Sequence, residues 1–224
     1  MGDIKQNLAY ITRAMAAAAI KSGRKPEDIQ LVGVTKSIDT ERMSQLAMAG
    51  VTCFGENRVQ DFLPKYEALN PGPKWHFIGS LQRNKVKYII DKVEMIHSLD
   101  NLALAKEIDK RARDAGLVMD VLIEVNIASE DSKHGIKPED AVSFADKLDE
   151  YKNIRPKGLM CIAPFVENPE DNRVCFEKMR NLFIDINTRG HHNLTELSMG
   201  MSGDYVVAIE EGATMVRIGT ALVQ

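Results

Sequence analysis

The feature that most constrains this chain is a regular alternation of short apolar segments with longer amphipathic ones. Eight segments have the pattern of buried β-strands, and they recur roughly every two dozen residues, which is the period of a β-strand followed by a helix. Parallel strands need a crossover connection, usually a helix, and this spacing leaves room for one. The expected strands cover residues 31–36, 51–57, 74–80, 94–100, 119–128, 154–164, 194–204 and 214–221.

The segments between these strands predict helices, and glycine or proline often stands where a helix should end. Thr40 is expected to cap one helix, and Asp100 is expected to cap the helix that ends near Gly116. A further helix precedes the first strand. The expected helices cover residues 3–22, 40–50, 58–69, 82–90, 101–116, 138–151 and 169–189, with a short one that ends near 212.

This order predicts an α/β protein with a single domain, residues 1–224, folded as a (β/α)₈ TIM barrel. Seven helices lie between the eight strands, so the extra N-terminal helix is expected to close the outer ring. An open doubly wound sheet is the alternative. It accounts less well for eight strands, and no GxGxxG motif follows any of them.

The composition of the chain argues against several classes of binding partner. The net charge is −3 and the basic residues are scattered, so nucleic acid is not an expected partner. The three cysteines are widely spaced and form no CxxC pair, which favours a reducing cytoplasm. No apolar run approaches transmembrane length, and the histidines match no zinc motif. We therefore expect neither a membrane partner nor a metal.

Polar residues gather at the C-terminal ends of the predicted strands, which is where barrels of this kind carry their chemistry. Lys36 ends the first strand and Asn57 follows the second. Arg217 lies near the end of the eighth strand, followed by Gly219 and Thr220. Because these strand ends meet at one mouth of a barrel, we predict that the side chains converge there.

Two of the loops at these ends have the features of a phosphate site. The stretch "SMGMSGD" (198–204) offers Gly200, Gly203 and the Ser202 hydroxyl, and then opens a helix. The stretch "RIGT" (217–220) offers the N–H of Gly219 and the hydroxyl of Thr220. Either stretch alone is better explained by an ordinary tight turn. At neighbouring strands, the two together favour phosphate.

The position of Lys36 calls for a partner. Strand alternation puts Val32, Val34 and Lys36 on one face, and if that face is the barrel interior, Lys36 reaches the mouth near Arg217. A lysine near a cation is a good Schiff-base nucleophile. The alternatives are a lysine that extends to solvent at the rim or pairs with a carboxylate such as Glu56. A reactive lysine with a phosphate site indicates an aldehyde phosphate, either a sugar phosphate or pyridoxal 5′-phosphate (PLP).

Several stretches together resemble the pyridoxal phosphate homeostasis protein family. The bacterial members of this PLP-binding protein family are called YggS-like, and their fold is related to the barrel domain of alanine racemase. The resemblance runs from about residue 31 to 223. The matching stretches are "VGVTK", "FGENRVQ", "WHFIGSLQRNK", "HSLD", "VLIEVNIASEDSKHGI", "KGLM", "LSMGMSGD" and "ATMVRIGTALV".

The resemblance implies that PLP is the cofactor and that Lys36 carries it as a Schiff base. It also implies control of intracellular PLP and other forms of vitamin B6, in a monomeric cytoplasmic protein with apo PLP-dependent enzymes as recipients. The cofactor-binding residues that it implies are Lys36, Asn57, Met199, Ser202, Arg217, Gly219 and Thr220.

Three functions stay open. A PLP-binding protein without robust turnover is favoured, and no catalytic residue is assigned. A PLP-dependent amino-acid racemase is the alternative. Related racemases take a second base from a further domain, and this chain ends four residues after Thr220. A cation such as Arg217 at the pyridine nitrogen would also weaken the cofactor as an electron sink. A cofactor-free aldolase-like enzyme is the third, and the family motifs argue against it.

Three features have no assigned role. Glu124 stands where the family often has glutamine, and strand alternation faces it inward, where its carboxylate has the option of an ion pair inside the barrel. His76 lies within a strand, so a hydrogen-bonded core histidine is at least as well supported as a site residue. The polar loop 129–136 is either an ordinary connection or a lid over a ligand.

Overall fold

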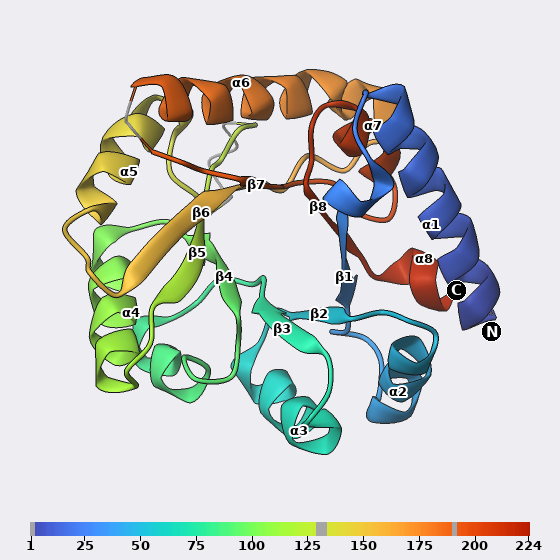
Figure 1. The fold of residues 1–224 in the computed structure, drawn as a ribbon, viewed down its shortest axis with the longest axis horizontal. Helices are drawn as coiled ribbons and strands as arrows, with labels where there is room; N and C mark the ends of the chain where they lie inside the picture. Colours follow the sequence, from blue (N-terminus) through green and yellow to red (C-terminus); the bar gives the residue numbers. More distant parts are fainter. Residues whose placement is uncertain (1–2, 129–133, 190–191) are drawn as a thin grey trace.

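A computed structural model describes residues 3–128, 134–189 and 192–224 of the chain. Within them, eight parallel strands form a closed barrel in which consecutive strands are neighbours and the last pairs with the first (Figure 1). The prediction of a (β/α)₈ TIM barrel is confirmed. The strands are β1 (Gln30–Val34), β2 (Cys53–Glu56), β3 (Lys74–Phe77), β4 (Met95–Leu99), β5 (Met119–Glu124), β6 (Ile154–Met160), β7 (Glu196–Ser198) and β8 (Met215–Ile218).

Helices form the outer ring of the barrel (Figure 1). The α-helices are α1 (Ile4–Lys21), α2 (Thr40–Met48), α3 (Val59–Leu69), α4 (Leu102–Asp114), α5 (Ala141–Leu148), α6 (Arg173–Arg189), α7 (Tyr205–Glu210) and α8 (Thr220–Val223). Short 3-10 helices are η1 (Pro26–Asp28), η2 (Arg83–Tyr88), η3 (Pro138–Asp140) and η4 (Pro169–Asn172). The segment η2 takes the place of the helix that was expected over 82–90. Residues 129–133 of the loop 129–136 lie outside the described residues.

Two predicted helix caps are wrong by one residue. Asp39, and not Thr40, caps α2, where its carboxylate accepts a hydrogen bond of 2.9 Å from the N–H three residues on. Asn101, and not Asp100, caps α4 in the same way at 2.8 Å. Each pair of neighbours holds two good capping residues, so composition alone does not decide which one precedes the first helical turn.

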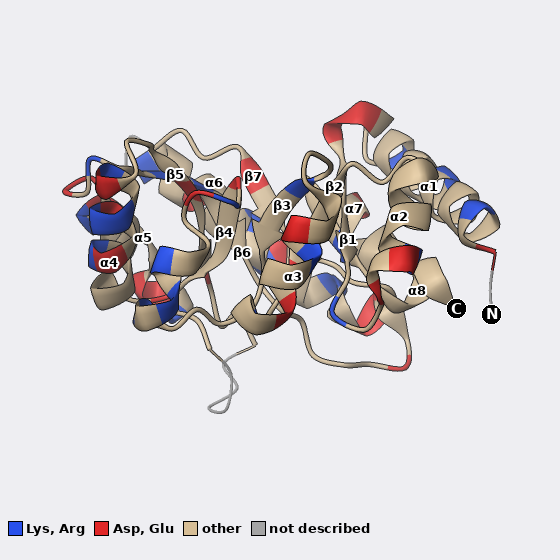
Figure 2. Cartoon of the chain, turned by 90° about the horizontal axis from the view of Figure 1, so that it is seen from below, with Lys and Arg blue, Asp and Glu red and all other residues tan. Residues whose placement is uncertain are grey.

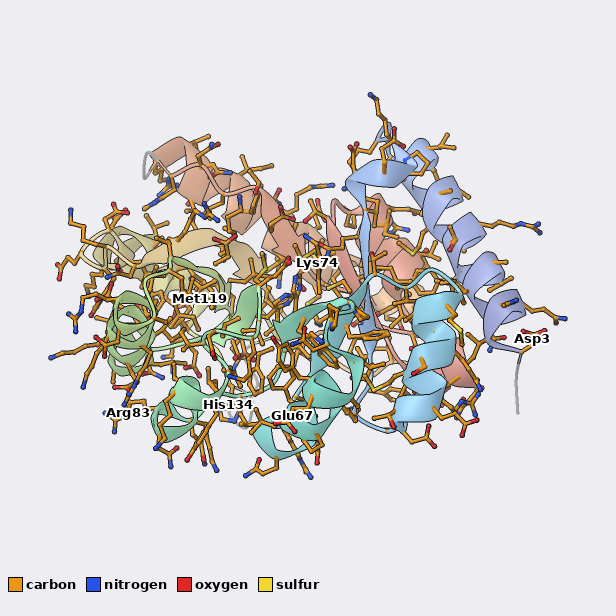
Figure 3. The ribbon with its side chains drawn as sticks, turned by 60° about the horizontal axis from the view of Figure 1, so that its bottom comes forward. Asp3, Glu67, Lys74, Arg83, Met119 and His134 are labelled. Atoms are coloured by element: carbon orange, nitrogen blue, oxygen red, sulfur yellow. The ribbon has the colours of Figure 1, made fainter. Side chains whose placement is uncertain are left out.

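Helix α1 closes the outer ring, as expected. It packs against α7 and α8 beside the seam between β1 and β8, and it buries Ile11, Ala18 and Ala19 (Figure 1). Asp3 lies at its N-terminal end (Figure 3), where a carboxylate oxygen accepts a hydrogen bond of 2.9 Å from the N–H of Lys5. The short helix α8 adds to this cover and was not expected from the sequence.

The barrel interior changes from apolar to polar along the strands. Met95, Leu122, Met160 and Met215 form their own buried cluster, separate from the larger core between strands and helices. Two residues further along β4 and β8, the side chains are polar and buried: His97 follows Met95, and Arg217 follows Met215. The polar end of the interior is therefore the C-terminal end of the strands, where barrels carry their sites.

The charged residues of the outer surface are of both signs. Basic and acidic segments alternate along α4 in Figure 2. Among the helices of the described residues, none combines the length and the apolar character needed to cross a lipid bilayer.

Candidate functional site

A cleft of about 480 Å³ opens at the C-terminal ends of β1, β6, β7 and β8. It brings together five of the seven residues that the sequence predicted to bind a cofactor, namely Lys36, Ser202, Arg217, Gly219 and Thr220. The complete lining is Val34, Lys36, Ile162, Ala163, Pro164, Phe165, Val166, Asn172, Met201, Ser202, Gly203, Asp204, Arg217, Gly219 and Thr220.

Lys36 follows β1 and has an exposed side chain on the wall of this cleft. The residue before it, Thr35, is fully buried and donates a hydrogen bond of 2.8 Å to Glu56. Among the described residues, none forms a hydrogen bond or an ion pair with the Lys36 side chain. The ammonium group is therefore available to a ligand in the cleft.

The carboxylate that the sequence offered as a partner for Lys36 is used elsewhere. Glu56 is fully buried at the end of β2, and its Oε1 lies 2.5 Å from Nζ of Lys65 on α3. Lys65 also donates a hydrogen bond of 2.6 Å to the carbonyl oxygen of Thr35. Sequence reasoning missed Lys65, because a helix residue reaches the strand ends only when the helix packs with that face inward.

Ser202 ties the two proposed phosphate loops together. Its Oγ accepts hydrogen bonds from the N–H groups of Gly219 and Ala221, both at 3.3 Å. At Gly203, no atom lies within 4 Å of the position that a Cβ would take, so the backbone there borders open space. Backbone N–H groups and hydroxyls around an open space suit an anion.

Arg217 forms the inner wall of the cleft and is only 5% exposed. Its Nη1 donates to Ser198 Oγ at 2.6 Å, and its Nη2 donates to the carbonyl oxygen of Cys161 at 2.8 Å. Burial lowers the pKa of Arg217, and the charges of nearby acidic groups raise it. An arginine stays protonated in proteins, and its remaining N–H donors are available to an acceptor in the cleft.

Asn172 also lines the cleft, joins two of its loops and is 2% exposed. Its Nδ2 donates to the carbonyl oxygen of Pro164 at 3.0 Å and to Oδ2 of Asp204 at 2.8 Å. The other oxygen of Asp204 accepts a hydrogen bond of 2.7 Å from the N–H of Met201. Asn172 therefore fixes the loop after β6 against the turn that carries Ser202. Nothing in the sequence singled it out, because its partners come from separate loops.

The same loop after β6 gives the cleft an apolar rim. Phe165 is 98% exposed, and Ile162 and Met201 are partly exposed beside it. Isolated apolar residues at a surface are common, but these three border one cleft that also holds Lys36 and Arg217.

Two predicted cofactor residues lie away from the cleft. Met199 is fully buried in the main core, because it follows inward-facing Ser198 and strand alternation turns it outward. Asn57 borders a separate groove with Ser80 and Lys85. Its Oδ1 is buried and has no hydrogen-bond partner among the described residues. The structure thus does not bring these two side chains to the wall that holds Lys36.

Glu124 ends β5 and is 6% exposed. Burial raises the pKa of its carboxyl group to about 7, and the charge of Asp100 acts in the same direction, while His134 and Arg217 lower it. The ion pair that strand alternation left open does not form with any of the described residues. The side chain is buried, as alternation indicates, but His134 lies near Asp100 and Arg217 donates to Ser198 and Cys161.

Size does not identify the site. An open groove of about 1210 Å³ between η2 and α4 is larger, but it contains none of the predicted site residues. Within the described part of the chain, no three His, Cys, Asp or Glu side chains are grouped so that they could hold a metal ion. The smaller cleft is the candidate site because of its chemistry and not its size.

Comparisons with known proteins bear on the ligand of this cleft. A family model described as the N-terminal domain of alanine racemase matches residues 6–224. The pyridoxal phosphate homeostasis protein of Aquifex aeolicus is 46% identical over 218 residues, which cover 97% of this chain and 96% of the relative. That of Synechocystis is 39% identical and covers 88% and 91% of the two chains. The structure of PipY from Synechococcus elongatus with PLP bound has a TM-score of 0.86 at 30% identity, over 99% of this chain and all of that one.

Proposed function

Because this chain belongs to the pyridoxal phosphate homeostasis protein family, we propose that it binds PLP through a Schiff base on Lys36 and acts in PLP homeostasis without robust turnover. The observation that carries the proposal is that an exposed lysine, with no partner among the described residues, shares one cleft with two loops suited to an anion. The proposal treats residues 1–224 as a single PLP-binding domain.

The donors around the cleft fit the chemical groups of PLP. The amine of Lys36 suits the aldehyde. The backbone at Gly203, which borders open space, and the hydroxyl of Thr220 suit the phosphate. Gly219 lines the same wall, and its N–H donates to Ser202 and so holds the two loops together. The spare N–H donors of Arg217 suit the nitrogen of the pyridine ring, which is a hydrogen-bond acceptor when it is not protonated. Asn57 and Met199 have no part in this assignment.

The identity of the residue at the ring nitrogen supports binding over turnover. PLP supplies an electron-withdrawing ring that stabilises carbanions, and this ability is greatest when the nitrogen carries a proton. Arg217 is a permanent cation, and a second positive charge beside it would be unfavourable. Arg217 therefore holds the ring by donating a hydrogen bond and keeps its nitrogen free of a proton.

We further propose that apo PLP-dependent enzymes are the recipients and that the protein is a cytoplasmic monomer. The apolar rim around Phe165 supports a transient contact at the mouth of the cleft, where a recipient would receive the cofactor. Within the described residues, which include all three cysteines of the sequence, no disulfide forms, which supports a reducing compartment.

A PLP-dependent amino-acid racemase is the second candidate, and Glu124 is the observation that favours it. A buried carboxyl group whose pKa is about 7 is suited to accept and return a proton near neutral pH. Steady conversion of one enantiomer of an amino acid by the PLP-loaded protein, lost in Glu124→Gln, would support the racemase over the carrier.

The test of the carrier function is the visible absorption spectrum of the purified protein before and after borohydride reduction. Wild-type protein should be yellow, lose the band on reduction and carry the label on Lys36. Lys36→Ala should lack the band, while Lys106→Ala, which removes an exposed lysine from the larger groove, should keep it. A wild type that stays colourless after PLP is added would overturn the proposal.

A further inference from the structure

A row of buried polar side chains crosses the barrel interior behind Arg217. Arg217 Nη1 donates to Ser198 Oγ at 2.6 Å. Ser198 Oγ lies 3.2 Å from Nδ1 of His97, and Nε2 of His97 lies 3.0 Å from Nδ1 of His76. The four residues come from β8, β7, β4 and β3. Each is at most 5% exposed, and of the four only Arg217 lines the cleft.

The positions of the protons give this row a direction. A guanidinium only donates, so Ser198 Oγ accepts from Arg217. The Ser198 hydroxyl proton then needs an acceptor, and the ring nitrogen Nδ1 of His97 is in reach. An Nδ1 that accepts leaves the imidazole proton on Nε2, which can donate to His76. All three hydrogen bonds therefore run the same way, from Arg217 toward His76.

The direction requires both imidazoles to be neutral, and the environment makes them so. Burial lowers the pKa of His97 well below its usual value, and the charges of His76 and Arg217 act in the same direction. Burial lowers the pKa of His76 to about 4, with a smaller effect from Lys74. Near neutral pH each ring keeps one nitrogen that accepts a hydrogen bond, and the row is intact.

We propose that Ser198, His97 and His76 are positioning residues that hold the guanidinium of Arg217 at the inner wall of the cleft. Arg217 then offers its remaining N–H donors to an acceptor atom on the ring of the bound ligand. This inference rests on the proposed function, because it takes that ligand to be PLP. Ser198 and the Cys161 carbonyl bind different nitrogens of the guanidinium, so together they fix its plane.

Without the row, the guanidinium of Arg217 would keep the hydrogen bond to the Cys161 carbonyl oxygen and lose the one to Ser198. Removing the Ser198 hydroxyl would also leave His97 Nδ1 buried with no donor among the described residues. Hydrogen bonds that run in one direction polarise one another, which makes Ser198 a stronger acceptor for Arg217. His97 and His76 thus act on the ligand only through Arg217.

The first test needs no ligand. Nitrogen-15 NMR of the histidine rings in the unliganded protein should show His97 and His76 neutral at pH 7, each with its proton on Nε2. In Ser198→Ala the His97 ring nitrogens should shift, because Nδ1 loses its donor. A wild-type His97 with its proton on Nδ1 would overturn the direction of the row.

The second test uses PLP and a matched pair of substitutions. His97→Gln offers an amide oxygen to Ser198 and an amide N–H to His76, whereas His97→Leu offers neither. We expect Ser198→Ala and His97→Leu to weaken PLP binding about tenfold and to move its visible absorption maximum, whereas His97→Gln keeps the wild-type maximum. Inorganic phosphate binding should be equal in all of them, since the phosphate loops are unchanged.

The outcomes separate this inference from the proposed function. A wild type without a PLP band refutes the proposed function, and the NMR result still decides the direction of the row. A wild-type band that Ser198→Ala and His97→Leu leave unchanged in position and affinity refutes the positioning role alone. If Ser198→Ala does not fold, the comparison of His97→Gln with His97→Leu decides whether the row positions Arg217.

Discussion

Two neighbouring strand ends at the barrel mouth use charged side chains in opposite ways. At the end of β2, the carboxylate of Glu56 has no exposed surface and is held by Lys65 at 2.5 Å and by the Thr35 hydroxyl at 2.8 Å. At the end of β1, one residue after Thr35, Lys36 is exposed and has no partner among the described residues. A charge neutralised within the protein stabilises the fold, and a charge left to the cleft is available for a ligand.

The two buried glutamates at strand ends repeat this contrast. Glu56 is paired with a lysine, whereas Glu124 has no ion pair among the described residues and a pKa of about 7. Burial alone therefore does not make a strand-end carboxylate functional or structural. What differs is whether a cation on the surrounding helices reaches it.

The largest expected effect separates the two lysines. Lys65→Ala should lower the free energy of unfolding by about 3–5 kcal/mol, because it leaves the Glu56 carboxylate buried without its cation. Lys36→Ala should change it by less than about 0.5 kcal/mol, because an exposed side chain is removed. Denaturant unfolding of both variants without PLP measures the difference, and equal losses would show that the two strand ends are not distinct.

The next effect concerns the two glutamates and depends on pH. In the fold the carboxyl of Glu124 keeps its proton up to about pH 7, against an ordinary pKa of 4.5. The protonated carboxyl group of Glu124 contributes fully to the stability of the fold below pH 4.5. This contribution is lost as the pH rises through 7, because the buried group must then ionise. Glu124→Gln should therefore be more stable than wild type at pH 8, by up to about 3 kcal/mol, and no different at pH 4.

Glu56→Gln is the matched control for this substitution. It leaves Lys65 without its carboxylate, so it should destabilise the protein at pH 8 instead of stabilising it. Unfolding by denaturant at pH 4, 6 and 8 measures how the free energy of unfolding of each variant depends on pH. If Glu124→Gln loses stability at pH 8, the carboxylate has a stabilising partner and the contrast between the two glutamates fails.

A smaller effect separates two glycines of the loop after β7. Gly200 has φ of +92°, and a Cβ there would lie 2.6 Å from that of Ala208, so Gly200→Ala should cost about 2 kcal/mol of stability. Gly203→Ala meets no atom within 4 Å and should cost less than about 0.5 kcal/mol. Its methyl group enters the cleft, so this variant should lose PLP affinity in a titration while it keeps its melting temperature.

The smallest effect tests the loop contact made by Asn172. Asn172→Ala removes two donated hydrogen bonds and leaves an oxygen of Asp204 without that donor, at a cost of about 1–2 kcal/mol. PLP should also dissociate faster, because the loop after β6 is no longer fixed against the turn at Ser202. Asn84→Ala, an exposed asparagine on η2, should change neither quantity. Unchanged dissociation in Asn172→Ala would remove this loop from the site.

The features that could be predicted from the sequence are those that depend on the local pattern of residues, namely the strands and the residues at their ends. Apolar runs and helix stop signals placed every strand. Strand ends in a closed barrel must meet, so five residues that line the candidate cleft could be named in advance. Met199 was assigned to the cofactor by resemblance, although strand alternation after Ser198 already directs it to the core.

Contacts between distant segments were beyond the sequence. The pairing of Lys65 with Glu56 depends on which face of α3 packs inward. The row from Arg217 to His76 depends on the relative register of four strands. Asn172 meets Asp204 only because two loops are adjacent at the mouth. Each of these is set by packing, on which the pattern of a single segment carries no information.

The seam between β1 and β8 also has a consequence for folding kinetics. Every other pair of neighbouring strands is consecutive in sequence, but this one joins Gln30–Val34 to Met215–Ile218 (Figure 1). Its formation closes the longest loop in the barrel, so we expect it to be a late step. Lys36 and Arg217 stand on opposite sides of this seam, and a chain that has not closed it cannot present the cleft. Ligand binding at the cleft would therefore report completion of the barrel.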